Sequence, residues 1–108
     1  MAKYLYLASY TPEGLRGLLK DGGTRRKEDL GEMVKELNGK LESIHFAFGE
    51  NDVYSIVDVP DNVSAATIAL KINASGAAKV TTVVLLTPEQ IDEAARIKVA
   101  YRPPGQKR

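Results

Sequence analysis

His45 is the only histidine in the sequence, and its side chain is the one whose ordinary pKa suits acid–base chemistry near neutral pH. A general base needs a bound substrate and a group that orients it. Asp58, on the next alternating segment, is a candidate for that second group. The structural interpretation is a partly buried histidine whose hydrogen bonds are satisfied within a strand. The sequence leaves both interpretations open and predicts His45 as the candidate catalytic residue.

Tyrosines form a second group that is suited to chemistry. Tyr4, Tyr6, Tyr10 and Tyr54 lie in two segments with alternating patterns, so several of them share a face. A tyrosine ring packs against apolar groups while its hydroxyl orients a ligand, which suits a small aromatic or quinone-like molecule. Tyrosines on a sheet also pack interfaces. We name Tyr6 and Tyr54 as candidate ligand-binding residues.

The segment FGENDVYSIVDVPDN, residues 48–62, is rich in acids but does not have the pattern of a metal site. Its aspartates are spread along a strand, unlike those of a calcium loop, and the chain offers one imidazole and no thiol. We therefore expect no metal and no cofactor. Gly49–Asp52 is interpreted as a hairpin turn, with positive φ available to glycine and asparagine, and Pro60-Asp61-Asn62 as a strand end and helix cap. Asp58, inside an apolar strand, needs a partner and is a candidate ligand-binding residue.

Arg25 and Arg26 open a predicted helix, where the helix dipole favours acids instead. This placement indicates a partner for one of them, either a carboxylate of the chain or an anionic ligand. Solvent exposure is the alternative. We name Arg25 as a candidate ligand-binding residue. Gly22-Gly23 does not make a phosphate loop, because no Gly-Lys-Ser/Thr follows it.

The elements that must position these residues follow from hydrophobic periodicity and capping signals. Threonine followed by proline predicts helix starts after Thr11 and Thr87, the latter with Gln90 completing a capping box. The predicted elements in chain order are a strand over 3–10, a short helix after Thr11, a helix from the cap Thr24 to Asn38-Gly39, strands over 40–48 and 53–59, a helix from Asn62 to Gly76, a strand over 79–86 and a helix after Thr87.

This order predicts an α+β, ferredoxin-like βαββαβ fold with an extra short helix after the first strand and a C-terminal helix. Helices would cover one face of an antiparallel sheet. The other face would carry apolar residues such as Leu5 and Leu7, and an apolar face of this kind should not remain exposed to solvent on a monomer. We therefore expect a homodimer, or a higher oligomer built from it, in which two sheets pack face to face as a dimeric α+β barrel.

Composition sets further limits. The chain has 108 residues, a net charge of +1 and no cysteine, which predicts one cytoplasmic domain over 1–100 and a basic tail over 101–108, with no nucleic-acid or membrane partner. Lysine and arginine are absent from 41–70, whereas acids are absent from Ala94 onward. The basic end is either solvated or packs on the acidic middle of the same or a partner chain.

The chain resembles the GYD-domain family, a part of the dimeric α+β barrel group. The resemblance runs from about Lys3 to Ile91 and rests on YLASYTPEGL with Arg25 or Arg26 after it, on FGENDVYSIVDVPDN and on KVTTVVLLTPEQ. Gly49, Asp52, Pro60 and Asp61 match the family's turn, whereas Asn51 stands at its tyrosine position. The resemblance implies the fold and a dimer more than any chemistry, since members are largely uncharacterised.

Three functional hypotheses follow. The first is a homodimer that binds a small organic molecule in a pocket lined by the sheet and the first helix. The second, implied by relatives of similar fold, is a cofactor-free enzyme of the monooxygenase or isomerase type, with His45 as base and Tyr6 or Tyr54 as orienting group. The third is a non-catalytic effector or interaction module. The sequence does not decide whether the protein is an enzyme.

Overall fold

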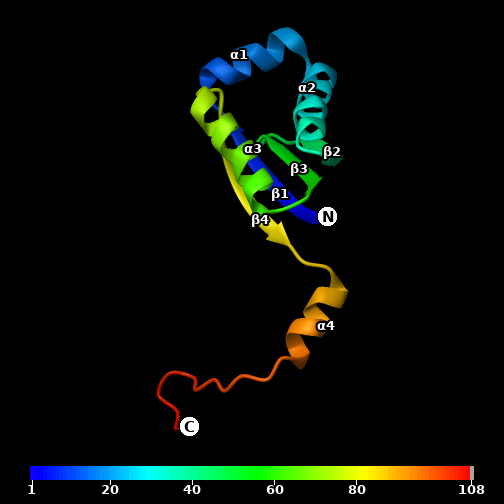
Figure 1. Ribbon diagram of the computed structural model, residues 1–108. Helices are drawn as coiled ribbons and strands as arrows, with labels where there is room; N and C mark the ends of the chain where they lie inside the picture. Colours follow the sequence, from blue (N-terminus) through cyan, green and yellow to red (C-terminus); the bar gives the residue numbers. More distant parts are fainter. Residues whose placement is uncertain (108) are drawn as a thin grey trace.

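A computed structural model describes residues 1–107 of the chain, which form a four-stranded sheet and four helices within that range (Figure 1). The fold is α+β and ferredoxin-like, as the order of elements predicts. The elements in chain order are β1 (Ala2–Tyr10), α1 (Pro12–Asp21), α2 (Gly23–Glu36), β2 (Lys40–Phe46), β3 (Val53–Val59), α3 (Asn62–Ser75), β4 (Ala78–Leu85) and α4 (Pro88–Arg96).

The strands lie in the order β2-β3-β1-β4, and every neighbouring pair is antiparallel. Tyr4 is paired with Val57 on β3 and with Val84 on β4. Because side chains alternate along a strand, this register puts the even-numbered residues of β1 and β4 on one face with the odd-numbered residues of β3. We call this the helix face, because α2 and α3 cover it, and we call the other side the open face (Figure 1).

Local capping chemistry starts most helices where the sequence predicts. The hydroxyls of Thr11 and Thr87 and the carboxylate of Asp61 each accept a backbone N–H from the first turn of α1, α4 and α3, respectively. Gln90 completes the capping box of α4. Gly76 ends α3 in the left-handed conformation (φ 77°), which glycine adopts without steric strain.

Three details of the sequence prediction were wrong. Thr24 does not cap α2, which begins one residue earlier, at Gly23, after an N-cap glycine without a side-chain cap. Strand β2 ends at Phe46, before Phe48. In the turn, positive φ is absent from Gly49 and Asn51, so the backbone there adopts ordinary conformations. Asp52 instead stabilises the turn, because its carboxylate accepts the backbone N–H of Tyr10 at 2.8 Å.

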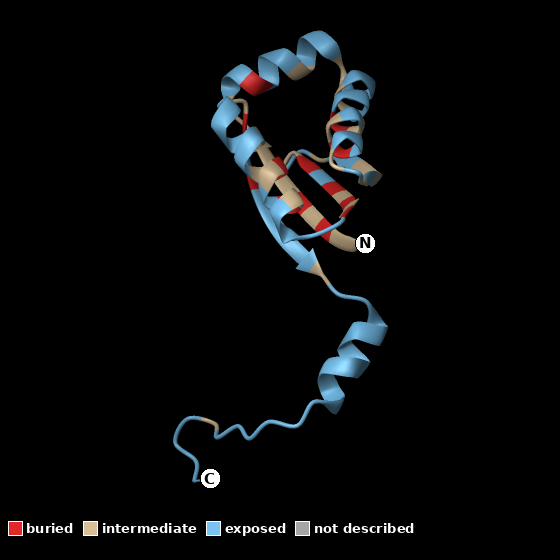
Figure 2. Ribbon diagram, in the orientation of Figure 1, coloured by how far each residue is buried: buried red, intermediate tan, exposed pale blue. Residues whose placement is uncertain are grey.

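The hydrophobic core lies between the helix face and the helices α2 and α3 (Figure 2). Val34 of α2 and Ile68 of α3 are almost completely buried against strand residues such as Tyr4 and Val57. The hydroxyl of Tyr4 donates to the side-chain oxygen of Asn62 at 2.5 Å, which connects β1 to the first residue of α3. The core thus holds α2 and α3 firmly on the sheet.

Helix α4 takes no part in this core. It projects from the end of β4, away from the sheet and the other helices, and the chain after it continues in the same direction (Figure 1). The radius of gyration is 17.5 Å. A compact domain of this length would have a radius of gyration of about 13 Å. The chain therefore consists of a compact body and a projecting C-terminal arm, which we define as residues 86–107.

Candidate ligand-binding site

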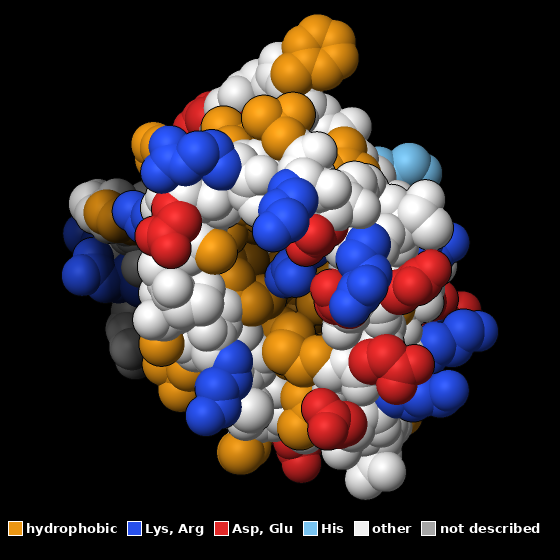
Figure 3. Space-filling model, turned by 90° about the horizontal axis from the view of Figure 1, so that it is seen from above, with side chains coloured by type: hydrophobic (Ala, Val, Ile, Leu, Met, Phe, Trp, Pro, Cys, Tyr) orange, Lys and Arg blue, Asp and Glu red, His pale blue; other side chains and the backbone are white. Residues whose placement is uncertain are grey.

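A pocket of about 420 Å³ opens on the helix side of the molecule, where residues of α1, α2 and α3 surround it. This volume lies within the usual range for small-molecule sites, roughly 300–1,000 Å³. Seen from above, it is a hollow with a hydrophobic floor and with charged side chains of both signs around its edge (Figure 3). We call this hollow the outer pocket.

One wall of the outer pocket is formed by α1. Its lining residues Gly14, Gly17, Leu18 and Asp21 recur at helical spacing, so a single face of α1 borders the space. The first turn of α1 packs tightly on the chain near Ala77. The buried Gly14 lies so close to the carbonyl group of Ala77 that any β-carbon would overlap it. Gly17 has nothing within 4 Å of a β-carbon position, so the missing side chain contributes open volume.

A smaller cavity of about 40 Å³ lies next to the outer pocket, against the sheet. Its lining is mainly apolar, and it includes Leu30, Val80 and the ring of Tyr6. We call it the inner compartment. Tyr10, Arg26, Ile72 and Ala78 line both spaces, so the two cavities adjoin. Together they offer a ligand a roomy entrance and a narrow apolar end.

Arg26 is the charged residue at this junction. Its side chain is half-buried, and among residues 1–107 no carboxylate lies within 4.0 Å of its guanidinium group. Burial raises the pKa of the neighbouring Tyr10, and the positive charge of Arg26 opposes this rise. Tyr10 is therefore a neutral hydrogen-bonding group beside a positive charge at physiological pH. An anion at the junction would meet both groups.

The charges farther out are mixed. Glu13, Asp21 and Asp29 line only the outer pocket, and Lys71 lies there too. Asp29 accepts a hydrogen bond from Arg25 at 3.2 Å, so this carboxylate already has a partner. Among residues 1–107, Arg26 is the only charged residue that lines the inner compartment.

Arg25 does not line either cavity of this site. It is exposed on α2, where its pairing with Asp29 one turn later raises its pKa. The sequence analysis considered both arginines and named Arg25. Adjacent residues on a helix point about 100° apart, so the placement of the helix on the sheet decides which of the two faces the pocket. Arg26 holds that position.

Tyr6 lies on the helix face, where its ring lines the inner compartment. Its hydroxyl donates to the backbone carbonyl of Ala65 at 2.7 Å, and burial raises the pKa of Tyr6 to about 12. The hydroxyl therefore holds α3 on β1. Tyr6 therefore contributes only the surface of its ring to the site. Tyr10 lies at the junction with Arg26, although the sequence analysis did not name it as a site residue.

His45 and Tyr54 lie on the open face, opposite the pocket, where they are direct cross-strand partners on β2 and β3. His45 is exposed, and 38% of the Tyr54 side chain remains accessible. Tyr6 and His45 are thus on opposite faces of the sheet and do not meet. Asp58 is four residues from Tyr54 along β3, a separation of roughly 13 Å, which is too far for it to orient His45.

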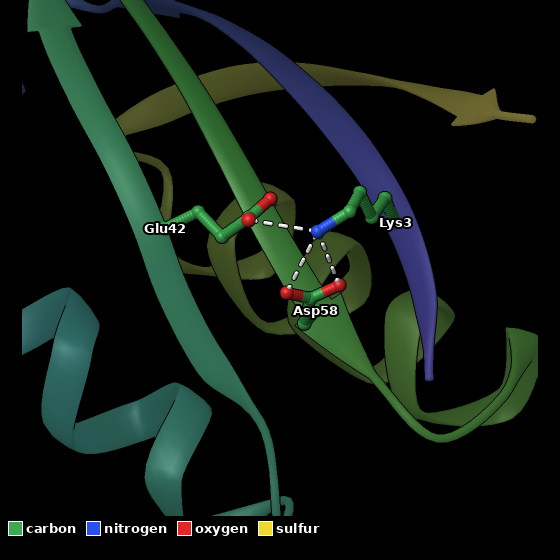
Figure 4. Close-up of polar contacts among 3 residues, drawn as sticks. All are labelled: Lys3, Glu42 and Asp58. Atoms are coloured by element: carbon green, nitrogen blue, oxygen red, sulfur yellow. Dashed lines mark hydrogen bonds and ion pairs between the residues drawn. The ribbon is translucent and has the colours of Figure 1, made fainter. Parts of the chain in front are cut away.

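Asp58 is instead part of an ion cluster on the open face (Figure 4). The ammonium group of Lys3 donates to both carboxylate oxygens of Asp58, at 3.1 and 3.2 Å, and lies 2.7 Å from the carboxylate of Glu42. Glu42 and then Asp58 raise the pKa of Lys3. The cluster joins β1, β2 and β3, so Asp58 has a cross-strand partner that accounts for its charge.

Nowhere in residues 1–107 do three or more histidine, cysteine or acidic side chains gather closely enough to hold a metal ion. In the same part of the chain, no helix has the length and apolar character to cross a membrane. The arrangement at the junction is suited to binding an organic anion through charge and hydrogen bonding.

Comparison with known proteins identifies the family. The model of the GYD domain matches residues 4–95, which includes nearly the whole sheet and nearly all of α4. The chain belongs to the GYD domain family. The match confirms the resemblance seen in the sequence, and its span puts both cavities within the family domain. No curated protein and no solved structure is significantly similar to this GYD-domain chain.

Proposed function

We propose that this GYD-domain protein is a homodimer that binds a small organic anion with an apolar body in the pocket between the helices and the sheet. The observation that carries the proposal is Arg26, a half-buried residue that lines both cavities. The anionic group, such as a carboxylate, binds Arg26 and Tyr10. The apolar part occupies the hydrophobic lining around it.

Energetics support an anion over a neutral molecule. Arginine binds carboxylates through two parallel N–H donors, and a low-polarity setting strengthens such charge-assisted hydrogen bonds. Leu30, Ile72 and Val80 provide that setting in the inner compartment. A cationic ligand would be repelled by Arg26 there, although the acids of the outer pocket are compatible with a polar or positively charged outer end.

His45 lies outside the pocket, on the other side of the sheet. Binding therefore accounts for the geometry better than catalysis with His45 as base. The site needs no proton transfer to explain Arg26, Tyr10 and their apolar surroundings.

The homodimer is supported by the open face. Leu5, Leu7 and Ile56 lie at its centre, half-buried, beside the more exposed Tyr54 and Val83. Because α2 and α3 cover the opposite face, these residues form a contiguous apolar surface that no helix within residues 1–107 covers. A second copy would cover it with an identical surface about a two-fold axis, the commonest symmetry of soluble oligomers.

A pair of fluorescent probes tests the site. Anilinonaphthalene sulfonate and N-phenylnaphthylamine share an apolar body, but only the first carries an anionic group. Replacement of Arg26 by Met should weaken sulfonate binding by about ten- to a hundredfold, which corresponds to the free energy of one charge-assisted hydrogen bond. The affinity for the neutral probe should stay nearly unchanged. Fluorescence titration of both probes gives the two dissociation constants.

Gly17 offers a way to fill the pocket without disturbing the core. Gly17→Leu adds a side chain on the face of α1 that borders the pocket, where a β-carbon meets open space. Both probes should bind more weakly. Gly31→Leu is the matched control, because Gly31 is also helical with an open β-carbon position but lies outside both cavities. Unchanged binding to Arg26→Met and Gly17→Leu would contradict the proposed site.

Native mass spectrometry of the gently purified chain tests the dimer separately and also detects a retained ligand. We expect a dimer, and Leu7→Glu should convert it to a monomer, because the carboxylate would be buried between two apolar faces. Leu19→Glu is the control, since Leu19 is 83% exposed on α1. A wild-type monomer would rule out the homodimer while leaving the pocket to be judged by the probe titrations.

A further inference from the structure

Helix α4 has an apolar side that no other part of residues 1–107 covers. Ile91, Ala94 and Ala95 recur at helical spacing on one side, whereas Glu93 points the opposite way. No residue of α4 is buried, and Ile91 is 52% exposed (Figure 2). An amphipathic helix with its apolar side in solvent lacks the packing that normally stabilises it.

The length of α4 makes this lack important. The helix has nine residues. Isolated helices shorter than about 12 residues are only marginally stable in water, even with good helix formers. The capping box at Thr87 and Gln90 fixes where the helix starts but does not supply a surface for it. A helix this short requires a contact beyond its own residues to remain folded.

The apolar surface continues along the rest of the arm. Leu86 before α4 is 57% exposed, and after α4 the exposed fractions of Ile97, Val99 and Tyr101 are 64, 81 and 77%. Large apolar residues at this density, all exposed on one projecting segment, are unusual for a surface that remains in water. Together with Ile91, these residues give the arm a set of large apolar side chains that the structure leaves exposed.

Continuity with the open face indicates what covers the arm. Strand β4 contributes Val83 and Leu85 to the open face and then leads directly into the arm. A second copy seated on the open face would therefore lie beside the start of the arm. The arm would then follow the surface of that copy, because it leads away from its own body beyond the end of β4 (Figure 1).

Charge also favours a second copy. From Ala94 onward the sequence has Arg96, Lys98, Arg102, Lys107 and Arg108 and no acid, whereas residues 41–70 have acids and no lysine or arginine. A basic end of the arm, from Ala94 onward, and an acidic region on every chain make two copies complementary in both directions. This reciprocity is a property of two-fold dimers, in which each contact occurs twice.

We infer that the C-terminal arm, residues 86–107, is exchanged between two copies of this chain, with the apolar side of α4 packed on the body of the partner. The inference rests on the proposed homodimer but not on the pocket or its ligand. The arm adds helix and tail surface to an interface that would otherwise consist of the sheets alone. Exchange explains why a short helix with no intrachain packing is folded.

Photo-cross-linking with isotope-labelled chains tests the exchange. The sequence has no cysteine, so Ile91→Cys provides a single attachment point for a benzophenone maleimide. The labelled light chain is unfolded and refolded with a large excess of wild-type chain grown on heavy isotopes, so that nearly every light chain has a heavy partner. Cross-linked peptides are then identified by mass spectrometry. Glu93→Cys, on the opposite side of α4, is the matched control.

Exchange predicts cross-links that join a light arm to a heavy body, more abundant from position 91 than from position 93. Cross-links that join a light arm to a light body would show that the arm folds onto its own chain and would overturn the inference. A dimer without cross-links from position 91 would do the same. A monomer would overturn both the exchange and the homodimer, whereas failed probe binding would overturn only the pocket.

A substitution gives a second test. In an exchanged arm, Ile91→Glu should weaken the dimer by tenfold or more, as expected for a buried apolar contact at an interface. Leu70→Glu is the control, because Leu70 is 68% exposed on α3 of the body. Sedimentation velocity over a range of concentrations measures both dissociation constants. Equal effects of the two substitutions would contradict a special role for the arm.

Discussion

The helix face and the open face of the sheet are made from alternate residues of the same strands but have different roles. On the helix face, Tyr4 and Tyr6 are buried, and each donates its hydroxyl hydrogen bond to α3. On the open face, Tyr54 stays accessible beside leucines that lack a cover. One face is covered by the chain's own helices, whereas the other is the surface on which we propose that a second copy packs. The difference shows that tyrosines in neighbouring strands need not form one site.

Truncation of one tyrosine on each face should give the largest contrast. Tyr4→Ala removes a ring that is 2% exposed from the core and should cost about 3–5 kcal/mol of unfolding free energy. Tyr54→Ala should lower the free energy of unfolding much less, but it should raise the dissociation constant of the dimer by about tenfold. Urea unfolding and sedimentation velocity measure the two effects. Equal losses of folding stability would break the distinction between the faces.

Removal of one hydroxyl sharpens the comparison. Tyr6→Phe should lower the free energy of unfolding by about 1 kcal/mol at neutral pH, because the hydrogen bond to Ala65 is lost while the ring stays. The folded pKa of Tyr6 is about 12, against an ordinary value of 10.0. The unfolded chain therefore loses this proton first as the pH rises, so the stabilisation present below pH 10 declines between pH 10 and 12.

Urea unfolding across that pH range checks the direction of this change in stability. The wild type should lose more stability between pH 10 and 12 than Tyr6→Phe does, because the variant has no hydroxyl to ionise. Parallel declines in the two proteins would mean that the folded state does not favour the neutral form of Tyr6.

The ion cluster on the open face should give the smallest effect. Glu42 and Asp58 raise the pKa of Lys3 above 10.5, so their stabilising effect is complete below that pH and is lost as the pH rises through the folded pKa. Lys3→Met should remove this high-pH decline and reduce the dependence of stability on salt, with a smaller change at neutral pH than Tyr6→Phe causes. Thermal unfolding at low and high salt measures the effect, and an unchanged salt dependence would contradict it.

The fold could be predicted largely from the sequence because its signals are local. Thr11, Asp61 and Thr87 act as helix caps through bonds to residues three positions away, and the strand alternation fixes which residues share a face. The glycine-initiated start of α2 was missed because Gly22 caps with its backbone alone. The family resemblance was also visible in the sequence, since its motifs lie in the strands and turns that define the sheet.

The candidate site could be predicted only in part. The sequence indicated that an arginine at the start of α2 would have a partner, but the selection of Arg26 over Arg25 depends on how α2 sits on the sheet. Gly17 gave no chemical signal at all, because it contributes to the pocket through the absence of a side chain. Neither cavity could be inferred from spacing, since each is bounded by elements far apart in the chain.

The sequence by itself determined the order of elements, the caps, the alternation of faces and the family, because these depend on contacts between near neighbours and on side-chain periodicity. Only the tertiary structure decided which tyrosines are buried in the core and that Asp58 forms an ion cluster with Lys3 and Glu42. It also decided that His45 lies on the face opposite the pocket and that α4 projects away from the sheet. These outcomes depend on strand register and helix placement. Such long-range packing is set by the whole chain at once.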